Sequence, residues 1–248
     1  MRRPLVTSHA ACKGHAPENT LAGIQRAIAL GADAIEIDVH CTSDGVPILL
    51  HDKTVDRTTD GSGDVHGMTL DVVRALDAGA RQFVPQFQGE RIPTLAEVLA
   101  LTKDRVLLQI EIKQAEIEEQ IAAVVRDADA IPSCETHSFW PQNVERMRKV
   151  EPRMAAALLT DGRSIVDWDE FFSFALSLGA QGVSVHYASA TPERVRQGQL
   201  RSLTFMVWTV DDEADMARMA AAGADSICSD FPDVVRRVVD AHGRSAAR

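Results

Sequence analysis

The chain has 248 residues, 45% of them hydrophobic and 25% charged, and this composition excludes an intrinsically disordered protein. Its 26 Lys and Arg against 36 Asp and Glu give a net charge of −10, which speaks against a nucleic acid or an anionic membrane as partner. An acidic protein that binds an anion needs local compensation from a cation or from a few well-placed basic side chains.

The cysteines and the apolar segments indicate a cellular compartment. The cysteines are far apart and form no C-x-x-C pair, so we expect reduced thiols and no zinc or redox motif. The apolar run after the basic N-terminus ends by Thr7, too soon for a secretory signal, and no stretch has the length of a membrane span. We therefore expect a cytoplasmic protein without a membrane anchor, whose oligomeric state the sequence leaves unknown.

Short β-type runs alternate with helical patterns from one end of the chain to the other, which is typical of βα units around a parallel sheet. The predicted strands cover residues 5–9, 34–39, 106–112, 133–139, 154–159, 182–185, 204–210 and 225–229. The predicted helices cover residues 18–30, 95–102, 117–126, 141–150, 164–178, 192–201, 212–222 and 232–241. Eight such units close an α/β fold of the (β/α)8 or TIM-barrel type. An open doubly wound sheet is the alternative, but no G-x-G-x-x-G follows a strand.

Residues with strong positional preferences support these helix boundaries. N-cap residues are predicted at Thr94, Thr191 and Asp211. Glycines that end helices are predicted at Gly31, Gly179 and Gly223. Residues 52–93 are rich in Gly, Asp and Thr and break the alternation of strand and helix. We expect one domain over residues 1–248, with an insertion at about 52–93.

Acidic residues alternate with apolar ones on two of the predicted strands. Period-two alternation places Glu36 and Asp38 on one face of the second strand, and it places Glu111 and Lys113 on one face of the third. On one strand alone, the acidic residues are better explained as surface charges. The two strands together indicate a site, because charges that point into a barrel need a partner. Three converging carboxylates suit one hard divalent cation, namely Mg²⁺, Ca²⁺ or Mn²⁺.

Two histidines flank the acidic strand in the sequence. His9 ends the first strand, and His51 follows the short extended run 46–50. Histidines can remove a proton from a nucleophile and deliver one to a leaving alkoxide, which are the two transfers that phosphodiester cleavage requires. A bound cation would stabilise the charge that develops on the phosphate. Spacing does not assign the two roles, and we take His9 as the base and His51 as the acid.

A series of distinctive motifs follows in order along nearly the whole sequence. The N-terminal motifs are His9, Pro17-Glu18-Asn19-Thr20, residues 31–39, Thr42-Ser43-Asp44-Gly45, His51-Asp52 and Asp56-Arg57-Thr58-Thr59. The later motifs are Leu76-Asp77-Ala78-Gly79, Ile92-Pro93-Thr94-Leu95, Glu111-Ile112-Lys113, Ser138-Phe139, Trp208-Thr209-Val210-Asp211 and Gly223-Ala224-Asp225. In this order the motifs resemble those of the glycerophosphodiester phosphodiesterase family, and the resemblance implies a (β/α)8 barrel with a small insertion after the second strand.

The resemblance also assigns roles to individual residues. It implies that Glu36, Asp38 and Glu111 hold the divalent cation and that His9 and His51 are the acid and base. It further implies that Lys113 faces the phosphate and that Trp208 forms a wall for the alcohol portion. For Trp208, a packed core aromatic is an equally good interpretation.

The chain departs from the family pattern beside the first histidine. The family has Arg-Gly at the two positions that Ala10 and Ala11 occupy here, and an arginine would bind phosphate in a bidentate manner. Candidates for replacing its charge are Lys13, His15 and Lys113. Three further histidines fall near strand ends, and each of them alone is better explained as a structural residue. As a group they indicate a rebuilt phosphate or alcohol site, with His40 and His186 as candidate substrate-binding residues. They are His40, His137 and His186.

The sequence therefore predicts an enzyme that hydrolyses a small phosphodiester, by default a glycerophosphodiester, to an alcohol and glycerol 3-phosphate. One alternative keeps this chemistry and changes the substrate to a sugar phosphodiester or a lysophospholipid. A second alternative is a catalytically weakened barrel that only binds a phosphorylated ligand, although the five central residues are intact. Attack by a hydroxyl of the substrate, with a cyclic phosphate intermediate, is left open as a route.

Overall fold

The computed structural model describes residues 3–246, so residues 1–2 and 247–248 of the predicted domain lie outside the described residues. Its strands are β1 (Leu5–Ser8), β2 (Ala34–Cys41), β3 (Pro47–Leu49), β4 (Leu107–Ile112), β5 (Cys134–Ser138), β6 (Ala155–Thr160), β7 (Gly182–His186), β8 (Thr204–Trp208) and β9 (Ser226–Ser229). Its helices are α1 (Leu21–Ala29), α2 (Leu70–Arg74), α3 (Leu95–Thr102), α4 (Glu118–Asp127), α5 (Pro141–Val150), α6 (Trp168–Ser177), α7 (Pro192–Leu200), α8 (Glu213–Ala222) and α9 (Pro232–Ala246).

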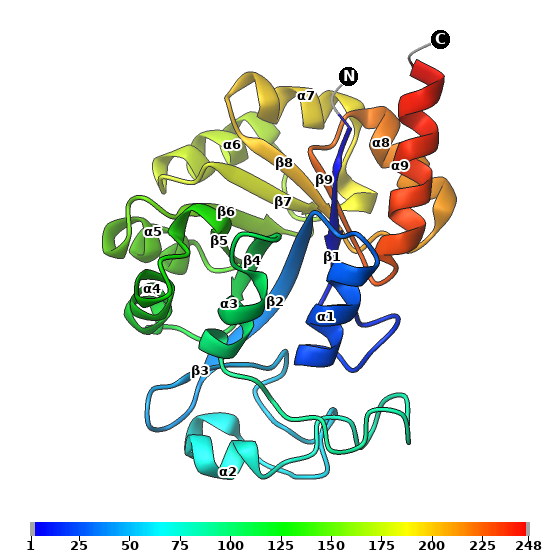
Figure 1. Cartoon of the computed structure of the whole chain (residues 1–248). Coiled ribbons are helices and arrows are strands. Elements are labelled where there is room, and N and C mark those ends of the chain that lie inside the picture. The colour runs from blue at the N-terminus through cyan, green and yellow to red at the C-terminus, as the bar shows by residue number, and fades with distance from the viewer. Residues whose placement is uncertain (1–2, 247–248) are drawn as a thin grey trace.

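The sheet closes on itself as a barrel with helices around it (Figure 1). Parallel neighbours run in the order β1-β9-β8-β7-β6-β5-β4-β2, and β1 also pairs with β2, which closes the ring. The predicted TIM barrel is thus confirmed, and the open doubly wound sheet is excluded. The short strand β3 pairs antiparallel with β2 at Val39 to Leu49 and stands outside the ring.

Strand alternation separates the core of this barrel from its site. The odd-numbered apolar residues of β2 are fully buried and pack in one cluster with α3; they are Ile35, Ile37 and Val39. The intervening Glu36 and Asp38 therefore face the opposite way, into the barrel. A second cluster on the far side contains Phe172 of α6 and Phe205 of β8, whose rings lie 6.4 Å apart.

Most predicted helix boundaries hold to within a few residues. Thr94 and Thr191 are N-caps, and Gly31, Gly179 and Gly223 have the left-handed φ angles predicted for helix-ending glycines. Three N-terminal boundaries were wrong, each because an oxygen-bearing side chain caps the helix later in the sequence. These caps are Thr20 before α1, Asp167 before α6 and Asp212, rather than Asp211, before α8.

The segment between β3 and α3 packs on its own small apolar cluster. It contains the 3₁₀ helix η1 (Val65–Gly67) and α2, and its buried members include Val55 and Val73. Figure 1 shows α2 and the adjoining loops beyond the carboxyl ends of β1 and β2, opposite the start of β1 and the end of α9. The segment therefore lies at the rim where barrel active sites form. Among residues 3–246, no helix combines the length and the apolarity that a membrane crossing requires.

Phe172 gives a test of the packing between α6 and the barrel. Phe172→Ala is expected to lower the free energy of unfolding by about 3–5 kcal/mol, because it removes a fully buried ring and leaves a cavity. Phe174→Ala on the same helix, where the ring is 46% exposed, should cost about 1 kcal/mol or less. Urea unfolding of both variants measures the difference, and equal losses would contradict this account of the packing.

Candidate active site

Three carboxylates from neighbouring strands meet inside the carboxyl end of the barrel. Glu36 and Asp38 lie on β2, and Asp38 is the register partner of Glu111 on β4. One potential ligand atom from each residue lies within 4.8 Å of the others. The structure thus brings together the three acidic residues that the alternation in the sequence placed on one face.

Among residues 3–246, the hydrogen bonds of this group leave one buried carboxylate oxygen without a partner. Asn19 Nδ2 donates to Asp38 Oδ2 at 2.7 Å, and Asn19 Oδ1 accepts from the Asp38 backbone at 3.0 Å. The backbone N–H of Ala10 donates to Glu36 Oε2 at 2.8 Å. Glu36 Oε1 is buried and has no hydrogen-bond partner in the part of the chain that the structure describes. An unpaired buried oxygen is costly, and a cation would satisfy it.

Lys113 supplies positive charge to this acidic group. Its ammonium lies 2.8 Å from Glu111 and 3.2 Å from Asp38. One lysine does not neutralise three carboxylates. Burial, followed by the charge of Asp38, raises the pKa of Glu36 to about 8, which means that the cation-free chain binds a proton there near neutral pH.

The loop after β1 reaches the acidic group through two residues in left-handed backbone conformations. Ala10 and Ala11 have φ angles of 43° and 71°, which non-glycine residues adopt only at a cost. In this conformation both N–H groups point at Glu36. Ala11 donates to its backbone carbonyl at 2.9 Å, while Ala10 donates to its side chain. The loop thereby fixes the orientation of the carboxylate.

His9 stands beside this loop at the end of β1 and is held by Asp230, just after β9. The distance from His9 Nδ1 to Asp230 Oδ1 is 2.6 Å, which leaves Nε2 available for chemistry. Burial alone would lower the pKa of His9. The hydrogen bond with Asp230 and the charges of Glu36, Asp230 and Asp38 outweigh burial and raise this pKa to about 9.

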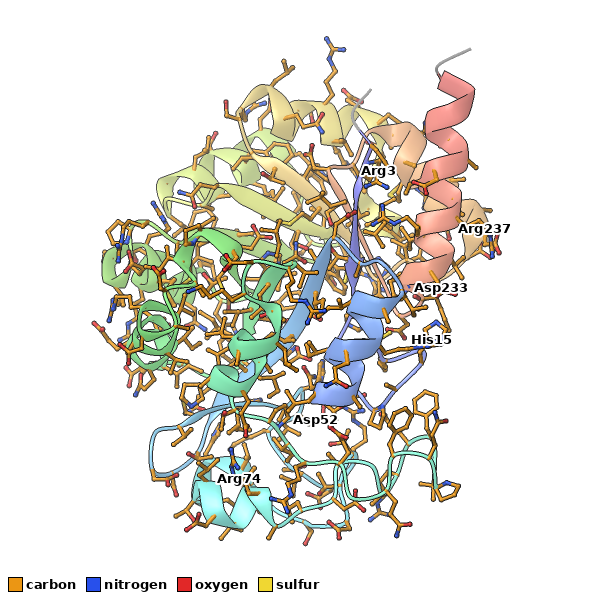
Figure 2. All side chains as sticks on the ribbon, in the orientation of Figure 1. Arg3, His15, Asp52, Arg74, Asp233 and Arg237 are labelled. Atoms are coloured by element: carbon orange, nitrogen blue, oxygen red, sulfur yellow. The ribbon has the colours of Figure 1, made fainter. Side chains whose placement is uncertain are left out.

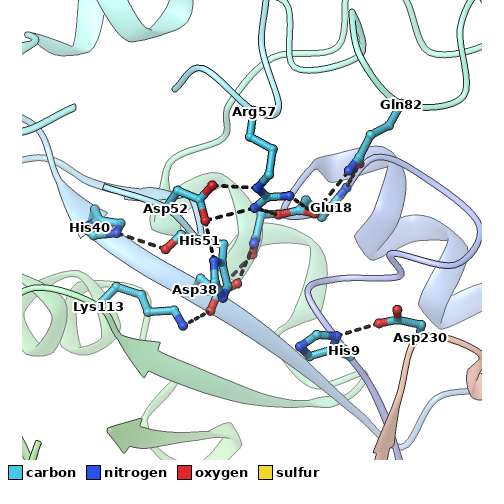
Figure 3. A network of polar contacts seen from close by, with 11 residues as sticks. His9, Glu18, Asp38, His40, His51, Asp52, Arg57, Gln82, Lys113 and Asp230 are labelled. Carbon is cyan, nitrogen blue, oxygen red and sulfur yellow. Dashed lines mark hydrogen bonds and ion pairs between the residues drawn. The ribbon is translucent and has the colours of Figure 1, made fainter. Parts of the chain in front are cut away.

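His51 is held in the same way by a different carboxylate (Figure 3). Its Nδ1 lies 2.7 Å from Asp52 Oδ1. Arg57 donates to Asp52 through Nε at 2.6 Å and to both oxygens of Glu18 at 2.6 and 2.8 Å. The hydrogen bond from Arg57 is the main cause that lowers the pKa of Asp52 to about 2, so Asp52 stays ionised. The insertion is tied to the barrel at this point.

The two histidines line one cavity of about 210 Å³ inside the barrel mouth, and Glu36, Glu111 and Lys113 line it with them. Trp208 forms part of its wall, and its indole N–H donates to the Ser184 carbonyl at 3.1 Å. The ring of Phe139 stands edge-on to Trp208 at 5.4 Å. The wall around the reacting groups is therefore partly aromatic and fixed in orientation.

The two other predicted substrate-binding histidines lie farther out. His186 contacts the edge of the Trp208 ring, with ring centres 5.2 Å apart. His40 is buried, and its Nδ1 lies 3.0 Å from Nε2 of His66, a residue of the insertion. Its Nε2 lies 3.4 Å from the backbone carbonyl of His51. His40 thus contacts the backbone of His51 rather than the cavity that His9 lines.

A larger cavity of about 710 Å³ lies at the opposite end of the barrel. Its lining includes Leu5, Leu107 and Thr204, which are the first residues of β1, β4 and β8. Barrel enzymes place their chemistry at the carboxyl ends of strands, and neither His9 nor His51 lines this hollow. We therefore assign the candidate active site to the smaller cavity.

Sequence reasoning missed the residues that orient this site. Asp230 and Asn19 belong to neither of the strands on which the acidic pattern was recognised. Asp230 directly follows the last barrel strand, so its position in the chain was the one available signal that it reaches the same rim.

Comparison with known proteins identifies one family. Residues 9–234 match the model of the glycerophosphoryl diester phosphodiesterase family. A protein of Caldanaerobacter subterraneus subsp. tengcongensis, named glycerophosphodiester phosphodiesterase, is 36% identical over 243 residues, covering 96% of this chain and 98% of the relative.

Solved structures give the same result. A phosphodiesterase from Oleispira antarctica, in complex with the product sn-glycerol-3-phosphate, superposes with a TM-score of 0.85 at 28% identity and covers 96% of this chain and 97% of its own. A glycerophosphodiester phosphodiesterase from Agrobacterium tumefaciens has a TM-score of 0.84 at 29% identity, with coverage of 95% and 100%.

Asp230→Asn tests what sets the charge of His9. The pKa of His9 in chelator-treated protein is expected to fall from about 9 toward 6.5, because the variant removes a negative charge and the hydrogen bond to it. His9 would then be largely neutral at pH 8, where the parent chain keeps it charged. Imidazole NMR signals followed against pH measure this shift.

Asp233→Asn is the matched control for this experiment. It removes the carboxylate that lies 2.8 Å from His15, a pair that Figure 2 shows at the start of α9. The pKa of His9 should stay near 9 in this variant. A His9 pKa that is the same in both variants would contradict the role of Asp230.

Proposed function

Because the chain belongs to the glycerophosphoryl diester phosphodiesterase family and is an enzyme of that kind, we propose that it uses one divalent cation and two histidines to cleave a glycerophosphodiester. The products would be an alcohol and sn-glycerol 3-phosphate, the compound named as product in the Oleispira antarctica structure. One observation carries the proposal. His9 and His51 are each anchored at Nδ1 by a carboxylate and line the cavity into which Glu36 and Glu111 open.

The acidic group fits a hard divalent cation. Glu36, Asp38 and Glu111 would hold it, and the unpartnered oxygen of Glu36 is the atom that most needs such a partner. Carboxylate oxygens are the ligands that Mg²⁺, Ca²⁺ and Mn²⁺ prefer. When bound, the cation would stabilise negative charge on the phosphate oxygens.

The two histidines would move protons on the reacting oxygens. Both have Nδ1 fixed by an aspartate, so Nε2 of each is the atom that exchanges a proton. We propose His9 as the base and His51 as the acid. This assignment requires a neutral His9, and the pKa of about 9 belongs to the chain without its cation, in which the uncompensated charges of Glu36 and Asp38 contribute to the shift.

The remaining predicted residues would surround the substrate. We propose that Trp208, beside His186, packs against the alcohol or glycerol portion, since its indole lines the cavity wall. Lys113 would face the phosphate while it keeps its contacts with Glu111 and Asp38. His40 would act indirectly, through its contact with the carbonyl of His51.

Domain organisation and location are also proposals. We propose one barrel domain whose insertion, about residues 52–93, completes the site by supplying Asp52 and Arg57. The four cysteines are buried free thiols, as expected for a reducing compartment, and we propose that the enzyme works in the cytoplasm.

Turnover of glycerophosphocholine tests the function directly. Chelator-stripped protein should release sn-glycerol 3-phosphate only after Mg²⁺, Ca²⁺ or Mn²⁺ is added. His51→Ala should lower kcat by about 10²–10⁴-fold, the usual contribution of a positioned acid or base. A coupled assay for glycerol 3-phosphate measures both effects.

Outcomes other than turnover point to the alternatives. Activity on a sugar phosphodiester or a lysophospholipid, with none on glycerophosphocholine, would keep the chemistry and change the substrate. Binding of sn-glycerol 3-phosphate without metal-stimulated turnover of any diester would contradict the proposal and favour a binding protein. His242→Ala, which removes a histidine of α9 that does not line the cavity inside the barrel, is the matched control for His51→Ala.

The assignment of His9 as the base predicts that the cation lowers its pKa. Saturating Ca²⁺ would compensate Glu36 and Asp38, two of the charges that raise this pKa to about 9, so the value should fall. NMR titration with Ca²⁺ and with chelator measures the difference. In Glu36→Gln the effect of Ca²⁺ should be smaller. An unchanged pKa in the parent chain would contradict the base assignment.

A further inference from the structure

A second cavity adjoins the two histidines. It has a volume of about 290 Å³ and shares His9 and His51 with the cavity inside the barrel. Its other walls come from the loop after β1, including Ala10 and Lys13, and from the start of the insertion. A group placed between the histidines is therefore in reach of both cavities.

Three of the cations around the histidines are already committed to carboxylates. Arg57 donates through Nε, Nη1 and Nη2 to Asp52 and Glu18. Lys113 is bound between Asp38 and Glu111, as described above. Lys53 forms an ion pair with Asp64 at 2.8 Å. The positive charges of these three side chains therefore mainly neutralise carboxylates of the protein rather than a bound anion.

Lys13 is different. Within residues 3–246, no carboxylate or carbonyl lies within hydrogen-bond or ion-pair distance of its ammonium, although it lines the second cavity. Its charge acts on Glu18, but Arg57 already occupies both oxygens of that residue. Its backbone is fixed, because its N–H donates to the His9 carbonyl at 3.3 Å and the N–H of Gly14 donates to that of Asp230 at 3.2 Å.

We propose that Lys13 binds a non-bridging oxygen of the substrate's phosphate in this cavity. The proposal rests on the proposed function. It adds a contact between Lys13 and the phosphate, in the cavity that Ala10 lines together with the two histidines. A phosphate that approaches His9 and His51 meets the carboxylates of Glu36, Asp52 and Asp230, so an uncommitted cation there offsets their repulsion. Lysine serves this purpose as a mobile point charge with three donors.

Binding of sn-glycerol 3-phosphate to the Ca²⁺-loaded protein tests the contact without turnover. Lys13→Ala should weaken binding by about tenfold or more in calorimetry, the effect of losing one charge-assisted hydrogen bond. Lys13→Arg should keep the affinity within about threefold of the parent, because it retains the charge.

Lys53→Ala is the matched control, because it removes a lysine of equal charge that is already paired. Its affinity should equal that of the parent. Unchanged affinity in Lys13→Ala, or an equal loss in both alanine variants, would overturn the proposal, the second because it indicates a general charge effect.

A second arm guards against a purely structural effect of Lys13. Ala10 lines the same cavity, so an arginine at this position can supply the lost charge. Compared with Lys13→Ala alone, the double variant Ala10→Arg/Lys13→Ala should bind sn-glycerol 3-phosphate more tightly and have a lower KM for glycerophosphocholine. No recovery, with a circular dichroism spectrum like that of the parent, would count against a phosphate contact in this cavity.

The experiment also separates this proposal from the proposed function. If binding of sn-glycerol 3-phosphate depends on Lys13 but the protein hydrolyses no diester, the anion site is supported and the proposed enzyme activity is refuted. Turnover of glycerophosphocholine that is unaffected in Lys13→Ala would keep the activity and refute the anion site.

Discussion

The structure depends on the burial of three like charges at the mouth of one barrel. The closed parallel sheet forces the alternate residues of β2 and β4 inward, so Glu36, Asp38 and Glu111 share a small volume. Buried carboxylates repel one another and lose hydration. The protein offsets part of this cost with Lys113 and Asn19 but leaves one oxygen of Glu36 unsatisfied. That unsatisfied oxygen is the atom of the acidic group that a bound cation would satisfy.

The loop after β1 is shaped by the same constraint. Its left-handed residues, Ala10 and Ala11, place two N–H donors on Glu36, and donors fixed by the main chain cannot rotate away as a side chain could. The left-handed backbone of this loop costs energy, and in return it holds the Glu36 carboxylate in one orientation. The small side chain of Ala10 also lines the cavity of about 290 Å³ beside His9.

Local pattern predicted much of this architecture, because the alternation within a strand and the repeated order of strand and helix are properties of residues that are close in sequence. The acidic face of β2, for example, followed from period two alone. The anchors were not predictable in this way. Asp230 is 221 residues from His9, and the side chain of Glu18 reaches Arg57 across 39 residues, so each contact exists only once the barrel has closed. Helix starts were misjudged where two acceptable caps stood close together, as at Asp211 and Asp212.

The two histidines differ in how the charge of their anchors is compensated. Asp52 forms an ion pair with Arg57 in addition to its contact with His51. Among residues 3–246, the side chain of Asp230 forms its ion pair with His9. The negative charges of Glu36 and Asp38 also raise the pKa of His9, so its protonation depends on any cation that neutralises these carboxylates. The same fold therefore gives two histidines in similar geometry with unequal electrostatic surroundings. This difference follows from the ion pair between Arg57 and Asp52 on one side, and from the acidic charges that surround His9 on the other.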